Sequence, residues 1–200
     1  MGNDQASDHP RRLEARRSLI RPPAFILRCA ILIGSLRPAD VLPASNHSNH
    51  LSIMSQIVPL ISSGTAGPLG VLHLPRLWLK ASLNAAGKLH PDYPFCGSGY
   101  DQMTLDALGI KKDDFLAFIN DKRPSYTQLE AWVAAYPGVN LTKGNLYKHN
   151  ASIMGYIHGD DVRKGVLDAA GLPDDGSVNP GAVDVNNLDD WTSFWTAELK

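Results

Sequence analysis

The sequence contains little cysteine and lacks any long uninterrupted hydrophobic stretch. Cys29 and Cys96 are the only cysteines among 200 residues, so at most one disulfide could form within the chain. Residues 25–36 fall well short of the roughly 20 apolar residues that cross a bilayer, and Arg28 interrupts them. The formal net charge of -1 predicts neither nucleic acid nor an acidic membrane surface as a partner.

Charge is distributed unevenly along the chain. Residues 1–53 carry seven arginines, no lysine and four acids, whereas residues 54–200 carry three arginines, nine lysines and sixteen acids. The first segment is open to three interpretations. It could be a secretory signal, although Arg28 lies within the apolar part. It could be a membrane span, although it is too short. It could also be a disordered or untranslated extension that precedes a working start at Met54. We favour the extension, which leaves one domain over residues 54–200.

With the extension set aside, Cys96 is the only cysteine of that domain. A single cysteine without a convincing export signal favours the reducing cytoplasm.

Strand-like alternation is nearly absent after Met54. The apolar residues recur instead at helical spacing between turn residues, and Pro75 suits the first turn of the first helix. We therefore predict an all-α domain of about seven short helices, at residues 74–86, 101–108, 115–122, 126–136, 143–157, 162–170 and 188–199. The segment over residues 87–100 contains three glycines and two prolines and is longer than most connections, so it is either functional or poorly ordered.

Motifs that mark the familiar kinds of active site are missing. The chain has no phosphate-binding loop with lysine and hydroxyl in register, no Gly-x-Ser-x-Gly and no paired His or Cys ligands for zinc after Met54. Asp160 and Asp161 favour the positive start of a helix more than a metal site. We predict no metal, no cofactor and no nucleic-acid partner.

Arg76 and Lys80 lie four residues apart and therefore share one face of the first predicted helix. Either they form a solvated face, with Asp101 as a salt-bridge partner that fixes the loop, or they bind an anionic ligand. In the second case Arg76 is a bidentate clamp, Lys80 adds charge, and Tyr93 and Tyr100 form the walls.

Several short motifs occur in a consistent order: LPRLWLK, AAGK, YDQ, LDALGI, FLAFI and LEAWV, which together cover much of residues 74–133. In this order they resemble an uncharacterised bacterial family known as domain of unknown function 5069. The resemblance implies a small, mostly helical protein with no established activity. Arg76 and Lys80 match the opening motif, Asp101 a turn aspartate and Trp132 a tryptophan, whereas Leu79 and Ser82 replace an acid and a base.

The leading functional hypothesis is a small cytoplasmic helical protein that binds an anionic small molecule or a partner through its first helix and the 87–100 loop. One alternative is an enzyme acting on an anionic small molecule, with Asp101, His90 or Cys96 as acid, base or nucleophile. Another is an interaction module that uses the aromatic residues of the last helix, Trp191, Phe194 and Trp195. The oligomeric state is not predicted.

Overall fold

Seven α-helices and one closing π-helical segment make up the secondary structure of residues 56–200, which are the residues that the computed structural model describes. The helices are α1 (Leu74–Ala85), α2 (Tyr100–Leu108), α3 (Lys112–Lys122), α4 (Tyr126–Ala135), α5 (Lys143–Gly155), α6 (Asp160–Ala170) and α7 (Ala182–Phe194), and the π-helix is η1 (Trp195–Leu199). Within this range there are isolated β-bridges and no strands. The prediction of an all-α domain is therefore confirmed. The predicted extension over residues 1–53 and the start at Met54 lie outside the described residues.

Local sequence signals account for several helix boundaries. Ser125 and Gln128 form a reciprocal capping box at the start of α4, which satisfies two backbone N–H groups that have no partner within the helix. Gly109 and Gly171 end α2 and α6 in the left-handed conformation that glycine adopts without steric cost. Pro75 lies in the first turn of α1, where no N–H is needed.

The last helix begins six residues earlier than the sequence predicts, at Ala182 instead of Leu188. Ala182, Val183 and Val185 are buried there, although β-branched valines are mediocre helix formers. Burial of this stretch against α5 and against Tyr100, at the end of the 87–100 loop, outweighs its low helix propensity. The final turn, Trp195–Leu199, is π-helical instead of α-helical.

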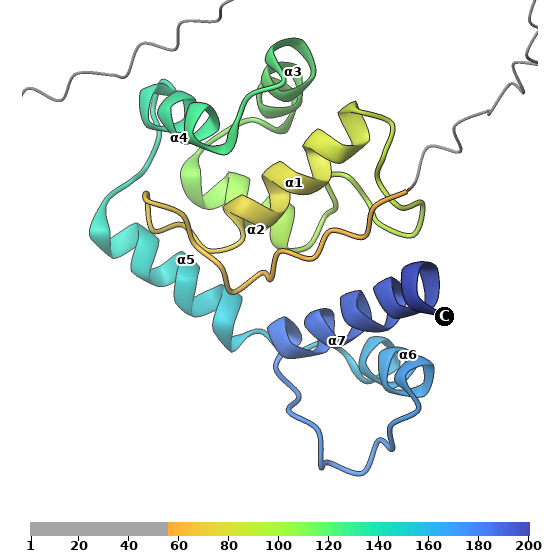
Figure 1. The fold of residues 1–200 in the computed structure, drawn as a ribbon. Coiled ribbons are helices and arrows are strands. Elements are labelled where there is room, and N and C mark those ends of the chain that lie inside the picture. The colour runs from red at the N-terminus through yellow and green to blue at the C-terminus, as the bar shows by residue number, and fades with distance from the viewer. Residues whose placement is uncertain (1–55) are drawn as a thin grey trace, which may run out of the picture. The chain divides into compact units, whose positions relative to one another are not determined.

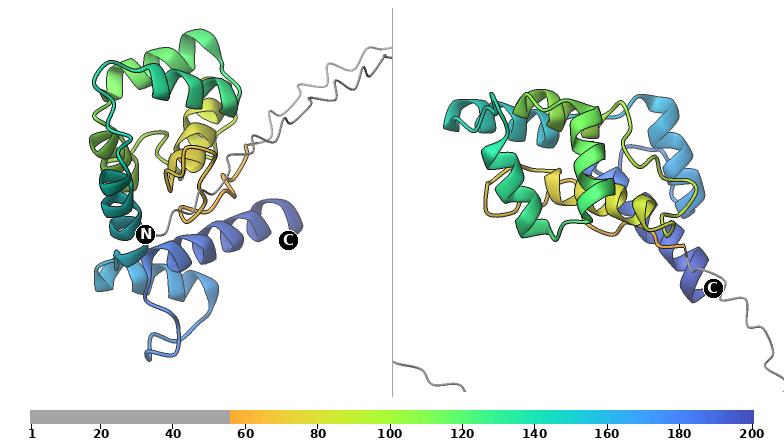
Figure 2. Two further views of the ribbon diagram at one scale, coloured as in Figure 1. Left: turned by 90° about the vertical axis from the view of Figure 1, so that its left-hand side faces the viewer. Right: turned by 90° about the horizontal axis from the view of Figure 1, so that it is seen from above.

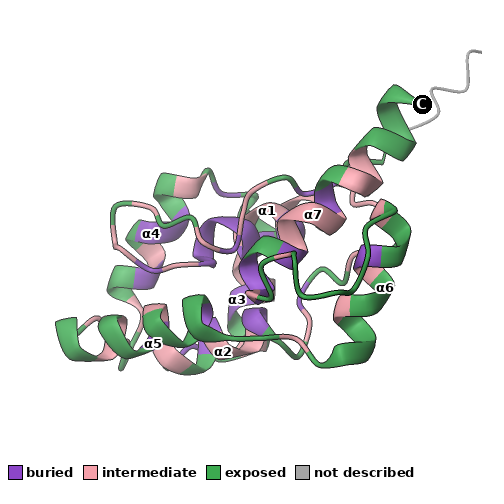
Figure 3. Ribbon diagram, turned by 90° about the horizontal axis from the view of Figure 1, so that it is seen from below, coloured by how far each residue is buried: buried purple, intermediate pink, exposed green. Residues whose placement is uncertain are grey.

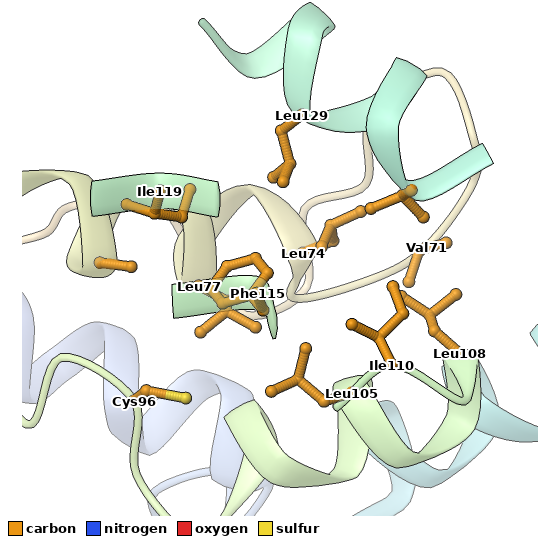
Figure 4. Packing of buried hydrophobic residues seen from close by; sticks show 12 residues of the cluster. Val71, Leu74, Leu77, Cys96, Leu105, Leu108, Ile110, Phe115, Ile119 and Leu129 are labelled. Atoms are coloured by element: carbon orange, nitrogen blue, oxygen red, sulfur yellow. The ribbon is translucent and has the colours of Figure 1, made fainter. Parts of the chain in front are cut away.

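The main core lies around α1, which contacts α2, α3 and α4 (Figure 1). Leu77 of α1 and Phe115 of α3 meet near its centre with Leu105 of α2, and each is fully buried (Figure 4). Burial of such side chains contributes about 1.5–3 kcal/mol each to folding. This core fixes α1 as a rigid platform for the polar side chains on its other face.

Helices α6 and α7 pack against each other, and α7 also contacts α5 (Figure 2). A second, smaller cluster joins this pair to the rest of the described chain, and its buried members are Tyr100, Ile153, Ala182 and Val183. The exposed end of α7 and η1 extends past this cluster (Figure 3).

Candidate functional site

A cleft of about 740 Å³ lies where the start of α1, the 87–100 loop and the beginning of α2 face residues of α6 and α7. Its volume is within the range of small-molecule sites, roughly 300–1,000 Å³. Arg76, Lys80, Tyr93, Tyr100 and Asp101 all line it. The structure thus brings together the four predicted ligand-binding residues and one of the three candidate catalytic residues.

Arg76 is buried and paired with other groups of the protein. Its guanidinium donates two hydrogen bonds to Asp190 of α7, with N–O distances of 2.6 and 2.8 Å. Its Nη1, which also contacts Asp190, lies 2.6 and 2.8 Å from the carbonyl oxygens of Pro59 and Ile61, so the two hydrogens of Nη1 are shared among three acceptors. The ring of Tyr93 lies 6.0 Å from the guanidinium carbon. A bidentate guanidinium–carboxylate pair uses the same donors that would clamp an anion. Arg76 therefore links α1 and the backbone at Pro59 and Ile61 to α7.

Lys80 is also buried, and its Nζ donates to Asp101 Oδ2 at 2.6 Å. Asp101 further accepts from the backbone N–H of Gly97 at 2.6 Å and from Nε2 of His73 at 2.7 Å. Three donors, two from α1 and its N-cap and one from the 87–100 loop, therefore converge on one carboxylate at the first turn of α2. Asp101 pairs with Lys80, as one sequence interpretation expected, but both side chains lie inside the protein and not on a solvated face.

His73 connects this carboxylate to a serine. Its Nδ1 lies 3.0 Å from Oγ of Ser63, and both residues line the cleft. An ionised carboxylate only accepts, so Nε2 of His73 carries a hydrogen toward Asp101. In a neutral imidazole Nδ1 is then unprotonated and accepts the hydroxyl hydrogen of Ser63. The result is a directed chain from Ser63 through His73 to Asp101.

Burial and charge determine the protonation states of His73 and Asp101 in this hydrogen-bonded chain. Burial lowers the pKa of His73, although its hydrogen bond to Asp101 opposes the effect. Burial alone would raise the pKa of Asp101, but the hydrogen bond from His73 and the charge of Lys80 outweigh it and hold the pKa below its ordinary value. A neutral imidazole therefore faces an ionised carboxylate at neutral pH.

His73 also has an unusual backbone. It precedes the first residue of α1 with φ of 68°, a left-handed conformation that is costly for a residue with a side chain. Its N–H donates to the carbonyl of Thr65 at 3.2 Å, and its carbonyl accepts the first hydrogen bond of α1 from Leu77 at 2.9 Å. Contacts on both ring nitrogens and on the backbone hold the imidazole in one orientation.

Aromatic side chains form one wall of the cleft. Tyr100 and Tyr156 contact edge to face with 5.7 Å between ring centroids, and Tyr156 contacts His158 in the same way at 5.8 Å. The hydroxyl of Tyr100 donates to the carbonyl of Ile153, and burial raises its pKa to about 12. Burial raises the pKa of Tyr93 as well. Both tyrosines therefore supply surface and do not exchange protons near neutral pH.

Asp189 brings a further carboxylate to the cleft beside the buried Arg76–Asp190 pair. Burial, followed by the charge of neighbouring Asp190, raises its pKa. Among the described residues its carboxylate has no hydrogen bond or ion pair with another side chain. Asp189 is thus an acidic group of the cleft whose carboxylate is available to a ligand that brings a donor or a positive charge.

The other two candidate catalytic residues lie elsewhere. His90 lines a neighbouring hollow of about 350 Å³, and its Nδ1 accepts from the N–H of Asp92 at 3.4 Å. Cys96 belongs to the main core (Figure 4), and burial raises the pKa of its thiol. A buried thiol with a raised pKa is a poor nucleophile.

Sequence reasoning missed Ser63, His73, Asp189 and His158. Only His73 gave a signal, because it directly precedes the helix that carries Arg76 and Lys80. Its left-handed backbone has no counterpart in the sequence pattern, since glycine or asparagine normally marks such positions. Ser63 lies in a turn, closed by the N–H of Thr65 on the carbonyl of Ser62, that resembles any other glycine-rich turn.

The aromatic residues of the last helix do reach the surface. Trp191 and Trp195 are 61% and 50% exposed, and Leu199, four residues further on, is 66% exposed. This spacing forms an apolar stripe along α7 and η1. The described residues do not identify what would cover this stripe.

No group of three or more His, Cys, Asp or Glu side chains is placed to hold a metal ion within residues 56–200. None of the helices described here has both the length and the apolar character needed to span a bilayer.

Comparison with known proteins adds no relative. No protein-family model, no curated protein and no solved structure matches this chain. The similarity to the 5069 family therefore rests on the motif residues alone.

Proposed function

We propose that the chain binds a small organic molecule in the cleft between α1, the 87–100 loop and the α6–α7 pair. The observation that supports this proposal most directly is the composition of the cleft. A buried polar chain that ends at Ser63 forms its floor, and the edge-to-face rings of Tyr100 and Tyr156 form a wall. Pockets that combine apolar surface with a few fixed polar groups are typical ligand sites.

Charge pairing redirects the expected ligand class from an anion to a neutral or cationic molecule. Both cations that line the cleft already hold a protein carboxylate, Arg76 with Asp190 and Lys80 with Asp101. The carboxylate of Asp189 is half-buried and has a raised pKa, so it gains from an incoming donor or positive charge. An anion would instead meet this carboxylate after losing its own hydration.

A thermal-shift screen of the full chain tests this proposal, with small amines, neutral polar compounds and carboxylic acids as three matched sets. Hits are expected mainly among the amines and neutral compounds. Val162 is 52% exposed and lines the cleft, so Val162→Trp should fill the site at little cost to folding and abolish binding. Asp189→Asn should weaken amine hits selectively, whereas Asp168→Asn, an exposed acid on α6 outside the cleft, should leave them unchanged.

Two outcomes would contradict the proposal. Hits that bind equally well to Val162→Trp would place the ligand elsewhere. Acid hits that are lost in Arg76→Ala but kept in Asp189→Asn would restore the anion clamp expected from the sequence.

Membership of the 5069 family, a bacterial origin and a cytoplasmic location remain part of the proposal. The motifs that carry the family resemblance fall largely within α1 to α4, and several of their apolar residues belong to the main core. Such residues are conserved for packing in many folds, so the likeness supports a shared fold more than a shared activity. A solved structure of a recognised member that does not superpose on α1–α4 would remove the assignment.

A further inference from the structure

We propose, building on the ligand cleft, that Ser63, His73 and Asp101 form a catalytic unit that cleaves small carboxylic esters. Ser63 is the nucleophile, His73 the general base, and Asp101 the positioning residue that orients the imidazole. These three residue types in this order of contact are the arrangement by which an ordinary serine becomes a nucleophile.

Ser63 is among the residues that line the cleft, and it is 1% exposed. The distance from Ser63 Oγ to Nδ1 of His73 is 3.0 Å, and that from Nε2 to Asp101 Oδ1 is 2.7 Å. Both distances allow hydrogen bonds, and the base must lie within such reach of the proton that it removes. The imidazole orientation is the reverse of that in the Ser–His–Asp triad of chymotrypsin-like enzymes, where Nε2 faces the serine, because here Nδ1 faces Ser63. The chemistry requires only one bare nitrogen and one fixed N–H, and His73 provides both.

The surroundings hold the imidazole firmly in place. Asp101 cannot swing away from His73, because Lys80 and the N–H of Gly97 hold its other oxygen, each at 2.6 Å. His73 has a left-handed backbone, and from this position its ring contacts Ser63. Costly backbone conformations that the surrounding structure enforces are concentrated at functional sites.

The proposed reaction balances with water as the only co-reactant. Ser63 Oγ bonds to the ester carbonyl carbon while its proton moves to Nδ1 of His73. The carbon–oxygen bond to the alcohol breaks, and the departing alcohol takes that proton. Water then attacks the acyl carbon and gives a proton to Nδ1. The bond to Oγ breaks, Oγ recovers the proton, and a carboxylic acid leaves.

The cleft also limits the substrate class. Its aromatic wall suits the apolar part of an ester, and the carboxylate of Asp189 favours a neutral or positively charged alcohol or acyl group over an acidic one. Esters of small amino alcohols or amino acids satisfy both conditions.

A fluorophosphonate probe tests the nucleophile directly in the full-length chain. The probe phosphonylates activated serines with loss of fluoride, and peptide mapping by mass spectrometry identifies the modified residue without any variant. We expect modification of Ser63. Ser63→Ala should abolish labelling, whereas Ser62→Ala, which changes the neighbouring hydroxyl in the same turn, should retain it. Loss of the base in His73→Gln should slow labelling by about 100-fold or more.

Asp101→Asn distinguishes positioning from structural support. An amide can donate to Nε2 of His73 and so favour the tautomer whose Nδ1 carries the hydrogen, which is wrong for Ser63. The labelling rate should therefore fall, and its dependence on pH should shift relative to the native chain. A role in stability alone would reduce the fraction of folded protein and leave the pH profile of the remainder unchanged.

The outcomes separate this inference from the proposed function. If amines or neutral compounds bind in the thermal-shift screen but folded native chain is not phosphonylated at Ser63, the catalytic inference is overturned and the ligand site stands. If neither binding nor labelling occurs, both fail. Labelling at Ser63 that persists at the native rate in His73→Gln also overturns the inference, because the base would then be irrelevant.

Discussion

Replacing Asp190 by asparagine should destabilise the protein strongly, whereas the same change at Asp189 should not. Asp190 is 2% exposed and accepts two hydrogen bonds from Arg76. The asparagine keeps the shape of the side chain, removes its charge and turns an N–H₂ group toward the guanidinium donors. Breaking one side of a buried ion pair typically costs 3–5 kcal/mol, because the remaining charge stays buried without its partner.

The expected loss lies near the lower end of that range, at about 3 kcal/mol. Arg76 keeps its hydrogen bonds to the carbonyls of Pro59 and Ile61, which still offset part of its burial. A domain of this size is usually stable by about 5–15 kcal/mol, so the variant should still fold. Urea denaturation followed by circular dichroism measures the difference if the slope with denaturant is unchanged.

Asp189→Asn is the matched control on the neighbouring residue. Burial and the charge of Asp190 raise the pKa of Asp189, so its ionised form is already disfavoured in the folded chain. Neutralising it should change the free energy of unfolding by no more than about 0.5 kcal/mol. Equal losses for the two variants would show that the Arg76–Asp190 pair does not hold α7 to α1. In that case Arg76 would again be a candidate ligand clamp.

Three further predictions concern stability. Gly67→Ala should lower the free energy of unfolding, measured by urea denaturation, by about 1–3 kcal/mol, because the added methyl would overlap Tyr126 and Glu130. An unchanged midpoint would show that these side chains move aside freely. Phe115→Ala should cost about 3–5 kcal/mol, since the ring is fully buried in the main core, and a loss below about 1 kcal/mol would contradict that packing. Acid should destabilise the native chain as pH falls below the ordinary histidine pKa of about 6.5, because the unfolded chain binds a proton that buried His73 resists. The slope from this residue is at most about 1.4 kcal/mol per pH unit, and denaturation curves of His73→Gln should lose it.

The sequence predicts those parts of the fold that depend on neighbouring residues. Ser125 and Gln128 identify the start of α4 within a single turn, and Gly109 and Gly171 identify the ends of two helices. The start of α7 at Ala182 could not be recognised in the same way, because it depends on burial against distant residues.

In the site, too, the features that depend on neighbouring residues could be predicted, and those that depend on distant residues could not. The shared helical face of Arg76 and Lys80 follows from their spacing, and the pairing of Lys80 with Asp101 was one of the two alternatives that the sequence left open. The partner of Arg76 did not follow, since Asp190 lies 114 residues further along the chain. The role of His73 could not be predicted either, because its orientation depends on a backbone conformation that residues other than glycine seldom adopt.

The long separation between Arg76 and Asp190 has a consequence for the time course of folding. Contacts between residues far apart in sequence require a large loop to close before they contribute any stabilisation, so they tend to form after the local helices and the core around α1. An interaction absent from the transition state affects mainly the rate at which the native state opens. The ion pair should therefore prolong the lifetime of the assembled cleft, and Asp190→Asn should accelerate unfolding while leaving the refolding rate nearly unchanged.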